Sequence, residues 1–215
     1  MTTDTYTDSE HMVLVPHTPR EDALGRDYEK WLQEVDNPFF NSIPGIVHYS
    51  NWRVLAPTPA VPFTHLDFMR VASLEAAGAL AANAEVSEFG DNWNRTWGRY
   101  PDAAGEEAHM NGHLYLCRRL AGRRPRTRYL ALMPASADPG GIPDDAEVWQ
   151  VTFAVIGDAR FAYLVVVSLA DAAAFAGMEA ALPEGCFGAA LAELIASPEV
   201  MGMPAAMSAG RSVVR

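Results

Sequence analysis

The sequence predicts an α+β protein whose two halves both follow the ferredoxin-like order of strand, helix, strand, strand, helix, strand. In the first half, short apolar runs that suit buried strands alternate with segments of helical periodicity. The second half repeats this pattern more weakly and lacks an obvious first helix. We therefore expect a disordered N-terminus over residues 1–10, a ferredoxin-like half with the site over 11–120, and a degenerate ferredoxin-like half over 121–215.

The first helix is expected to begin at Thr18, because Thr18-Pro-Arg-Glu21 has the spacing of a capping box. Pro38 is expected to end it, since proline lacks a backbone N–H and collides with the preceding helical turn. A Pro44-Gly45 turn then leads into the next strand. The apolar positions of the helix are Tyr28, Trp31, Leu32 and Val35.

The remaining elements follow from apolar runs and from alanine-rich segments. Helices are expected over residues 73–86 and 171–182, and residues 87–112 are expected to be irregular. The expected strands cover residues 11–16, 46–55, 63–71 and 113–120 in the first half, and residues 129–134, 148–156 and 160–169 in the second.

The second half is interpreted as a diverged copy of the first. Its first strand ends on Pro134, as the first strand of the other half ends on Pro16. Setting Phe63-Thr-His-Leu-Asp-Phe-Met69 against Phe161-Ala-Tyr-Leu-Val-Val-Val167 aligns both a strand and the helix that follows it. In that alignment the polar residues of the first copy meet tyrosine and valine. We therefore expect the first copy to have kept a site while the second became scaffold.

The composition is that of a soluble globular protein, with 49% hydrophobic and 20% charged residues. A formal net charge of −11 argues against nucleic-acid binding, which needs a positive face. The arginine-rich segment 118–128 is read as a solvated loop, or else as an anion-attracting rim or a dimer contact.

No apolar run approaches the roughly 20 residues that cross a bilayer. The polar, acidic N-terminus does not look like a signal peptide, so a cytoplasmic location is expected.

One stretch resembles a known family. Glu34-Val-Asp-Asn-Pro-Phe-Phe-Asn-Ser-Ile-Pro-Gly-Ile46, preceded by Trp31, is similar to the motif of EthD-like dimeric α+β barrel proteins. In that motif a tryptophan, a histidine and a proline close the first helix, and Pro-Gly and a strand follow. The spacing from Trp31 through Pro38 to Pro44-Gly45 is preserved. This chain departs from the pattern at Asp36, which stands where the family usually has histidine.

The resemblance implies two antiparallel sheets packed into a barrel, with a pocket between a sheet face and the helices or loops that cover it. Relatives include muconolactone isomerases, polyketide cyclases, cofactor-free monooxygenases, decarboxylases and heme-binding proteins, so the fold alone does not set the reaction. Either the two halves of one chain supply both sheets or two chains pair. A homodimer with a small-molecule substrate is expected, without nucleic-acid or membrane partners.

Strand alternation separates the candidate site residues into faces. Leu66 and Phe68 are expected to pack on the helices, which would turn His65 and Asp67 into the barrel. On the preceding strand, His48, Ser50 and Trp52 share one face, and Tyr49 lies on the other. Neighbouring antiparallel strands can then bring His48 or Tyr49 beside His65 and Asp67.

A histidine beside a carboxylate is a credible general base, because the carboxylate orients the ring and raises its basicity. Taken singly, each histidine is as well explained as a structural core residue. We interpret His65 as the base, Asp67 as its orienting group, and His48 or His17 as the donor to a developing oxyanion. The expected substrate-binding residues are Asp36, Tyr49, Trp52, Trp93, Trp97 and His113.

These residues predict a cofactor-independent enzyme of the lyase, isomerase or cyclase type, acting on a small aromatic or polyketide-like molecule. One alternative is a heme protein with His113 or His65 as axial ligand, and another is a non-catalytic carrier of a small ligand. A metal site at His109 and His113 is considered but not expected, since a third ligand at helical spacing is missing. No nucleotide-binding glycine motif and no nucleophile elbow is present in the sequence.

Overall fold

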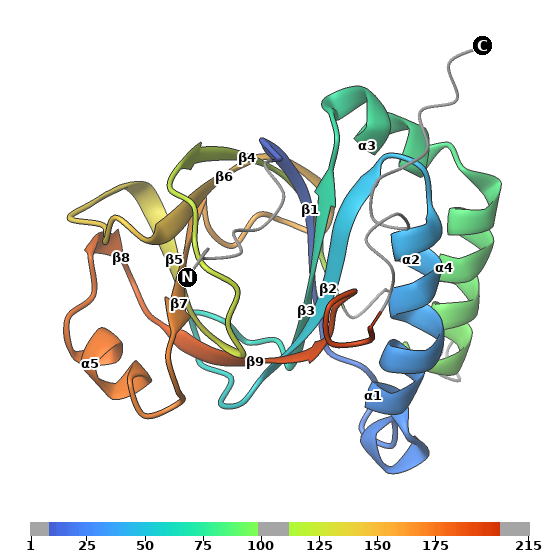
Figure 1. Ribbon diagram of the computed structural model, residues 1–215, viewed down its shortest axis with the longest axis horizontal. Coiled ribbons are helices and arrows are strands. Elements are labelled where there is room, and N and C mark those ends of the chain that lie inside the picture. Colours follow the sequence, from blue (N-terminus) through green and yellow to red (C-terminus); the bar gives the residue numbers. More distant parts are fainter. Residues whose placement is uncertain (1–8, 99–111, 203–215) are drawn as a thin grey trace.

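The computed structural model describes residues 9–98 and 112–202 of the chain (Figure 1). The strands in these ranges are β1 (His11–His17), β2 (Ile46–Val54), β3 (His65–Val71), β4 (Leu114–Ala121), β5 (Tyr129–Gly140), β6 (Ala146–Ile156), β7 (Tyr163–Leu169), β8 (Glu184–Cys186) and β9 (Ala190–Ala196). The helices are the short 3₁₀ segment η1 (Leu24–Arg26), α1 (Tyr28–Trp31), the π-helical turn η2 (Leu32–Asp36), α2 (Asn37–Ser42), α3 (Leu74–Ala81), α4 (Ala84–Thr96) and α5 (Phe175–Ala180). None of the helices in the described part combines the length and the apolar character needed to span a membrane.

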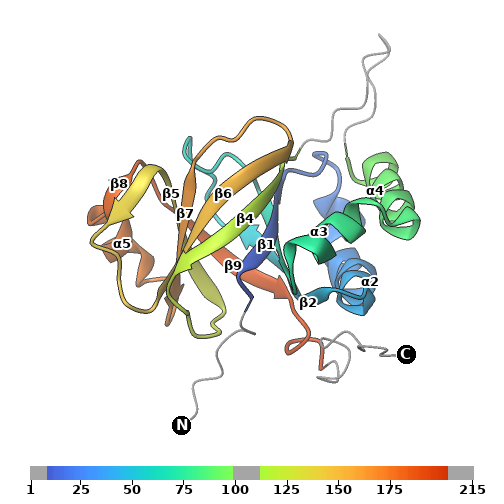
Figure 2. The same cartoon turned by 90° about the horizontal axis from the view of Figure 1, so that it is seen from above.

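The strands of the described residues form one antiparallel sheet in the order β7-β6-β4-β1-β3-β2-β9-β5-β8, and pairing of β7 with β5 closes it into a barrel. Each half contributes four neighbouring strands, β4-β1-β3-β2 and β9-β5-β7-β6, in the same ferredoxin-like order. The predicted α+β fold is therefore confirmed, and the barrel closes within a single chain. Figure 2 shows the ring with α2, α3 and α4 outside β1, β3 and β2.

The barrel interior is a continuous apolar core to which strands of both halves contribute. Its buried side chains include Met12, Leu14, Trp52, Leu66, Phe68, Tyr115, Leu130, Leu132, Trp149, Leu164 and Val166. Smaller apolar clusters lie outside the ring, on either side. In the first half, Tyr49 and Met69 pack with Leu80 of α3, and in the second half, Val165 and Val167 pack with Phe175 of α5.

The first helix does not end at Pro38, as the sequence predicted, but continues to Ser42. The π turn η2 comes just before α2, and Pro38 lies in the first turn of α2. A proline in a first turn removes no necessary hydrogen bond, and a π turn can absorb the crowding that proline causes. The prediction was wrong because it treated the proline as an interior residue of one straight helix.

Other boundaries also differ from those predicted. Residues 84–96 were expected to be mostly irregular, but they form α4, which begins where the Asn83 side chain accepts hydrogen bonds from the backbone N–H groups of Glu85 and Val86. The strands β8 and β9 were missed, and β9 completes the ring by pairing with both β2 and β5. Ser9, expected to lie in a disordered N-terminus, is buried and donates a hydrogen bond to the Val71 carbonyl at 2.5 Å.

Candidate active site

The two faces of the central strands carry very different side chains, and their directions are the reverse of the prediction. Leu66 and Phe68 point into the barrel core together with Trp52. His65 and Asp67, on the opposite face of β3, therefore lie on the outer side of the ring, beneath α1, η2 and α4. The grouping of residues by alternation was correct, but the direction was wrong, because a closed ring needs its inner face apolar.

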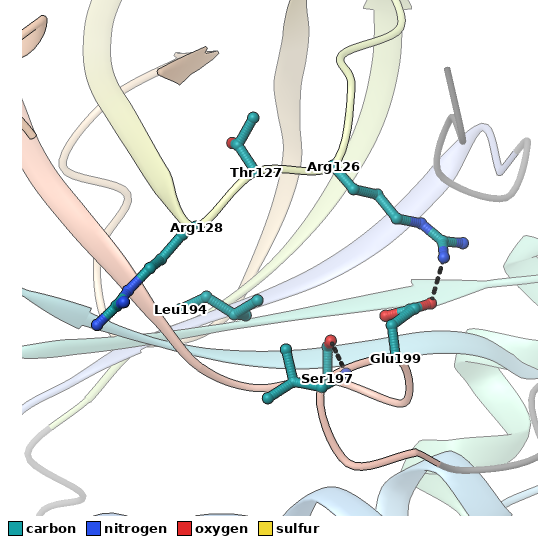
Figure 3. Close-up of a pocket in the computed structure, with 7 residues that line it drawn as sticks. Arg126, Thr127, Arg128, Leu194, Ser197 and Glu199 are labelled. Atoms are coloured by element: carbon teal, nitrogen blue, oxygen red, sulfur yellow. Dashed lines mark hydrogen bonds and ion pairs between the residues drawn. The ribbon is translucent and has the colours of Figure 1, made fainter. Parts of the chain in front are cut away.

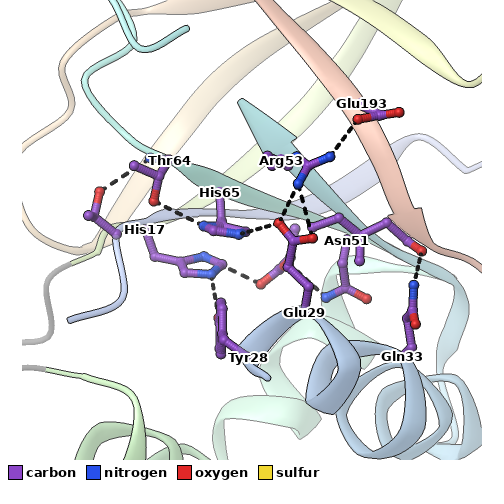
Figure 4. Close-up of polar contacts among 12 residues, drawn as sticks. His17, Tyr28, Glu29, Gln33, Asn51, Arg53, Thr64, His65 and Glu193 are labelled. Carbon is purple, nitrogen blue, oxygen red and sulfur yellow. Dashed lines mark hydrogen bonds and ion pairs between the residues drawn. The ribbon is translucent and has the colours of Figure 1, made fainter. Parts of the chain in front are cut away.

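Strand register brings the predicted residues of this outer face together. His17 lies directly opposite His65 across the β1–β3 pair, and Asn51 lies opposite Asp67 across the β2–β3 pair. The rings of His17 and His65 stack with centroids 5.6 Å apart. His17, His65, Asn51 and Asp67 are all at least nine-tenths buried. The helix layer then supplies Tyr28 and further polar groups from above (Figure 4).

Both ring nitrogens of His17 are already used. Trp93 Nε1 donates to the Tyr28 hydroxyl at 3.1 Å, and that hydroxyl lies 2.8 Å from His17 Nε2. The Val15 carbonyl lies 3.1 Å from His17 Nδ1 and can only accept, so Nδ1 carries the proton of the neutral ring and donates it there. His17 Nε2 therefore accepts the hydroxyl proton of Tyr28, whose oxygen accepts from Trp93. Burial lowers the pKa of His17 to about 4, so the ring is neutral at neutral pH.

His65 has one nitrogen that is not consumed in this way. Its Nδ1 lies 3.0 Å from the Thr64 hydroxyl, whereas its Nε2 is buried and makes no hydrogen bond. The nearest charged group is the Glu29 carboxylate, whose Oε1 lies 3.6 Å from Nε2. Burial lowers the pKa of His65, and Glu29 opposes this shift. The carboxylate partner of His65 is therefore Glu29, and not Asp67 as predicted.

A chain of ion pairs continues from Glu29 to the barrel rim. Arg53 Nη1 donates to both carboxylate oxygens of Glu29, at 3.1 and 3.2 Å, and its Nη2 lies 2.7 Å from Glu193 on β9. Glu193 also accepts from the exposed Arg128 at 2.7 Å. Contacts with His65 and Arg53 lower the pKa of Glu29, which keeps this carboxylate charged. This series of ion pairs thus connects the first-half site to strand β9 of the second half (Figure 4).

Two buried carboxyl groups share a hydrogen-bond network beside the histidines. The Asn51 amide donates to Asp36 Oδ2 at 2.8 Å and to Asp67 Oδ1 at 2.9 Å, and the Tyr49 hydroxyl donates to Asp36 Oδ2 at 2.7 Å. Burial raises the pKa of Asp67 to about 7 and that of Asp36 well above its usual range. Two carboxyl groups this close do not both ionise readily, so the pair retains a proton near neutrality. Asp67 Oδ2 also lies 3.6 Å from His17 Nδ1.

The π turn explains why Asn37 and Asn41 face the sheet beside Asp36. In a straight α-helix the inward positions after Leu32 would be Val35 and Asp36, yet Val35 is 43% exposed. The wider turn at η2 shifts the inward face by one residue, to Asp36, Asn37 and Asn41. Asn37 Nδ2 donates to Asn51 Oδ1 at 2.9 Å, which fixes the orientation of the bridging amide. The resemblance implied a pocket residue at position 36, and the structure places a buried carboxyl group there.

Aromatic rings cover the polar cluster on its helix side. Trp93 packs edge-on against His17, with ring centroids 5.4 Å apart, and Tyr28 packs edge-on against His65 at 5.2 Å. Trp97 and Trp31 surround Tyr28 from the other side, at 5.2 and 6.2 Å. The predicted pair Trp93 and Trp97 thus lies at the cluster. Trp52 does not, because its side chain belongs to the barrel core.

His48 lies on the inner side of the ring and does not join His65. Its Nε2 lies 3.2 Å from Glu199 Oε2, and Arg126 holds the other oxygen of Glu199 at 2.7 Å. Arg126 and Glu199 line an open groove of about 500 Å³ together with Arg128 and residues near the end of β9 (Figure 3). His48 therefore cannot donate to an oxyanion formed at His65.

His113 is also separate from the cluster. Its ring packs against Phe63 and Tyr115, with centroids 5.2 and 5.6 Å away, at the end of the barrel core. His109, its proposed metal partner, lies outside the described residues. Among residues 9–98 and 112–202, no group of three or more His, Cys, Asp or Glu side chains has the spacing to hold a metal ion.

Sequence reasoning missed four polar residues of the cluster: Tyr28, Glu29, Asn51 and Arg53. Alternation could have found two of them, because Asn51 and Arg53 share a strand face with the predicted Tyr49. Tyr28 and Glu29 depend on how the helix docks. The residue before them, Asp27, adopts the left-handed region at φ +62°, which turns the chain sharply into α1.

The site around His65 does not fit a heme, although the family resemblance includes heme proteins. An axial histidine needs a nitrogen that faces the flat surface of a porphyrin. Here Nε2 of His65 faces Glu29, and the ring itself is stacked on His17 and edge-on to Tyr28. His113, the other predicted ligand, packs among Phe63, Tyr115 and Gly157 at the barrel rim.

Sequence comparison finds no protein family and no curated protein that matches this chain. Solved structures with a similar fold include an anthrone oxidase-like protein, with a TM-score of 0.55 and 10% identity over 90% of this chain and 94% of the other. A chlorite dismutase-like protein has a TM-score of 0.52 and 13% identity, over 89% of this chain and 97% of the other. A candidate monooxygenase from Lactobacillus acidophilus has a TM-score of 0.50 and 7% identity, over 88% of this chain and 96% of the other. These proteins have the dimeric α+β barrel fold, and at such identities the likeness concerns the fold alone.

Proposed function

We propose that this protein is an enzyme that moves protons on a small aromatic or polyketide-like molecule, using His65 as general base and no resident cofactor. The observation that carries the proposal is Nε2 of His65, which is buried, makes no hydrogen bond and lies 3.6 Å from the Glu29 carboxylate. Buried polar atoms of folded proteins are rarely left without a partner, and such exceptions gather at functional sites. A substrate O–H or C–H group is the partner that this nitrogen lacks.

The proton transfer follows from the contacts of the ring. The base form that we propose for His65 has its proton on Nδ1, where Thr64 Oγ1 can accept it, and a lone pair on Nε2 that can take a proton. The lowered pKa keeps the ring neutral and ready at neutral pH. Once protonated, the imidazolium is stabilised by Glu29, which Arg53 holds in place. In this proposal the retained proton of the Asp36–Asp67 pair serves as a second acid that returns a proton to the product.

Proton removal next to a carbonyl or phenol is the step shared by isomerisation, elimination and cyclisation, so the proposal covers a lyase, isomerase or cyclase. Two structural neighbours are named for oxidase and monooxygenase activities, which favours a second outcome. The same carbanion, once formed, could form a C–O bond with dioxygen as co-substrate, and protonation then gives a hydroperoxide that loses water to leave a ketone at that carbon. In both outcomes the contribution of the protein is the deprotonation, and only the fate of the carbanion differs.

Anthrone is a suitable probe, because it is a small ring ketone whose methylene C–H becomes acidic through formation of an aromatic phenolate. The protein is incubated with anthrone in D₂O, and NMR follows exchange of the methylene protons while an electrode follows dioxygen. We expect exchange to slow by about 10²- to 10⁴-fold in His65→Gln. His113→Gln serves as the control, because this histidine lies outside the cluster. Full exchange activity in His65→Gln would show that the assignment is wrong.

The same samples distinguish the alternatives. A non-catalytic carrier would show quenching of tryptophan fluorescence by anthrone without any exchange, because Trp93 and Trp97 lie at the cluster. A heme protein would show a sharp spectral change with added hemin, which the packing of His65 does not favour. A homodimer is also proposed, although the ring is complete in one chain. Sedimentation at several protein concentrations tests that state.

A further inference from the structure

We propose that the cluster around His65 selects against carboxylate-bearing molecules and takes an uncharged ring that carries a hydroxyl or keto group. This inference rests on the proposed function, because it names the substrate class of the same site. It follows from the charges and the hydrogen-bonding capacity of the side chains that surround His65 Nε2.

The charged group nearest to His65 is a carboxylate, Glu29, which lies 3.6 Å from Nε2. The buried Asp36–Asp67 pair, joined through Asn51, adds carboxyl oxygens beside the stacked His17. A carboxylate ligand placed beside His65 would approach Glu29 at a distance where like charges repel, and a buried site screens this repulsion less than water does. A neutral ring avoids this cost.

Arg53, the cation beside Glu29, is already engaged. Both terminal nitrogens of Arg53 contact carboxylates, Nη1 at 3.1 Å from Glu29 and Nη2 at 2.7 Å from Glu193. A ligand carboxylate would have to displace one of them, and the bidentate fork that arginine offers to carboxylates is therefore not presented to the site. The other described neighbours of His65, the rings of His17 and Tyr28, are neutral at neutral pH.

Hydrogen-bonding capacity favours the same ligand class. Carboxylate oxygens and an unprotonated imidazole nitrogen are acceptors, so the site needs a donor from its ligand. A phenolic or enolic hydroxyl supplies one donor and leaves an oxygen that can accept a proton from the Asp36–Asp67 pair. Ring stacking on Trp93 and Trp97 then adds affinity without any charge.

The test is a matched pair of probes, 1-naphthol and 1-naphthoate, which share a ring and differ in charge at neutral pH. Dissociation constants are measured by calorimetry and by quenching of tryptophan fluorescence in the full chain. We expect naphthol to bind at least about tenfold more tightly than naphthoate. Glu29→Gln should narrow this ratio severalfold by improving naphthoate binding, and Glu179→Gln on the exposed face of α5 should leave it unchanged.

Glu193→Gln gives a second measurement at the barrel rim, in case Glu29→Gln disturbs the docking of α1. Removing this carboxylate releases one nitrogen of Arg53, so naphthoate binding should again improve relative to naphthol. Equal affinities for the two probes in the wild type, or a ratio unmoved by both substitutions, would overturn the inference. This inference is tested by a ratio of dissociation constants, whereas the proposed function is tested by the rate of His65-dependent exchange. Either test can therefore fail while the other succeeds.

Discussion

The two halves of the barrel share one strand order but differ in what lies on their outer faces. Strand pairing defines equivalent positions: β1 pairs with β3 as β5 pairs with β7, and β2 pairs with β3 as β6 pairs with β7. With His65 set against Tyr163, this register also places Pro16 against Pro134. The positions equivalent to His17, Tyr49, Asn51, Arg53 and Asp67 are Ala135, Ala146, Val148, Gln150 and Val165.

The difference shows what a buried polar cluster requires of a fold. The first half covers its outer face with α1, η2, α2 and α4, and these helices supply partners such as Tyr28 and Asp36 to the buried strand residues. The second half has the six-residue α5 and an apolar outer cluster that needs no hydrogen bonds. A buried polar group without a partner costs about 1–3 kcal/mol, so polar strand residues persist only beneath a helix layer that satisfies them.

The largest expected effect is on the rate of anthrone exchange, and it is tested by matched substitutions at the equivalent positions 65 and 163. His65→Ala should slow anthrone exchange by about 10²- to 10⁴-fold, because it removes the proton acceptor. Tyr163→Ala, the matched change in the second half, should leave the exchange rate within about twofold, since Tyr163 pairs with Ala135 there and does not belong to the cluster around His65. Similar losses in both variants, measured by NMR in D₂O, would mean that the halves do not differ in function.

The next effect concerns the amide that joins the two carboxyl groups. Asn51→Val installs the residue found at the equivalent position, Val148, and leaves Asp36, Asp67 and Asn37 each short of a partner. We expect the free energy of unfolding to fall by about 2–4 kcal/mol, measured by urea denaturation at neutral pH. Wild-type stability in this variant would show that the polar network does not hold the helix layer on the sheet.

A smaller and pH-dependent effect is expected for Asp67→Asn. The folded-state pKa of Asp67 is about 7, above the unfolded value of 3.8. Between these pH values the folded protein holds a proton that the unfolded chain has released, so this group makes the wild type less stable as pH rises from about 4 to about 7. The asparagine removes this dependence, and the variant should gain on the order of 2–4 kcal/mol relative to the wild type over that window.

The same comparison controls for the neighbouring histidine. Burial lowers the pKa of His17 to about 4, which makes both proteins more stable as pH rises toward the usual value of 6.5. Because His17 is present in both, its contribution cancels in the difference between the two unfolding free energies. A difference that stays flat with pH would contradict a protonated Asp36–Asp67 pair.

The smallest expected effect is the loss of stability when the partly exposed ion pairs of Arg53 are removed. Arg53→Gln, which copies the equivalent Gln150, removes contacts to Glu29 and Glu193 that are open to solvent. We expect a loss of about 0.5–1 kcal/mol in unfolding free energy, and a smaller loss at high salt, where such pairs are screened. Thermal unfolding at two salt concentrations measures it, and a loss that does not depend on salt would indicate a packing role for the arginine stem instead.

Much of the fold could be predicted from local patterns. The strands near residues 11–16, 46–55 and 63–71 were found because apolar runs and turn residues mark them in the chain. Strand β9, Ala190-Leu-Ala-Glu-Leu-Ile-Ala196, was missed because its alanines give no strand signal, and only pairing with β2 and β5 makes it extended. Helix α4 could have been predicted, because Val86, Phe89 and Trp93 recur at helical spacing, but the polar residues between them were interpreted as irregular structure.

The candidate site could be predicted only in part. Alternation placed His65 with Asp67 and apart from Leu66, since it depends only on the period of two in a strand. It could not find Glu29, which meets His65 only after the chain turns at Asp27 and α1 docks on the sheet. The separation of His48 from the other histidines also needed the register of β2.

By itself, the sequence determined the α+β class, the succession of β1 to β7 along the chain and which residues share a strand face, because these depend on periodicity within a few residues. The tertiary structure decided which face looks inward. Closing the ring packs strand against opposite strand, so the apolar residues Leu66 and Phe68 fill the barrel and His65 and Asp67 are left to the helices. It also decided the partners, because a π turn at η2 and a left-handed residue at Asp27 set which helix side chains reach them.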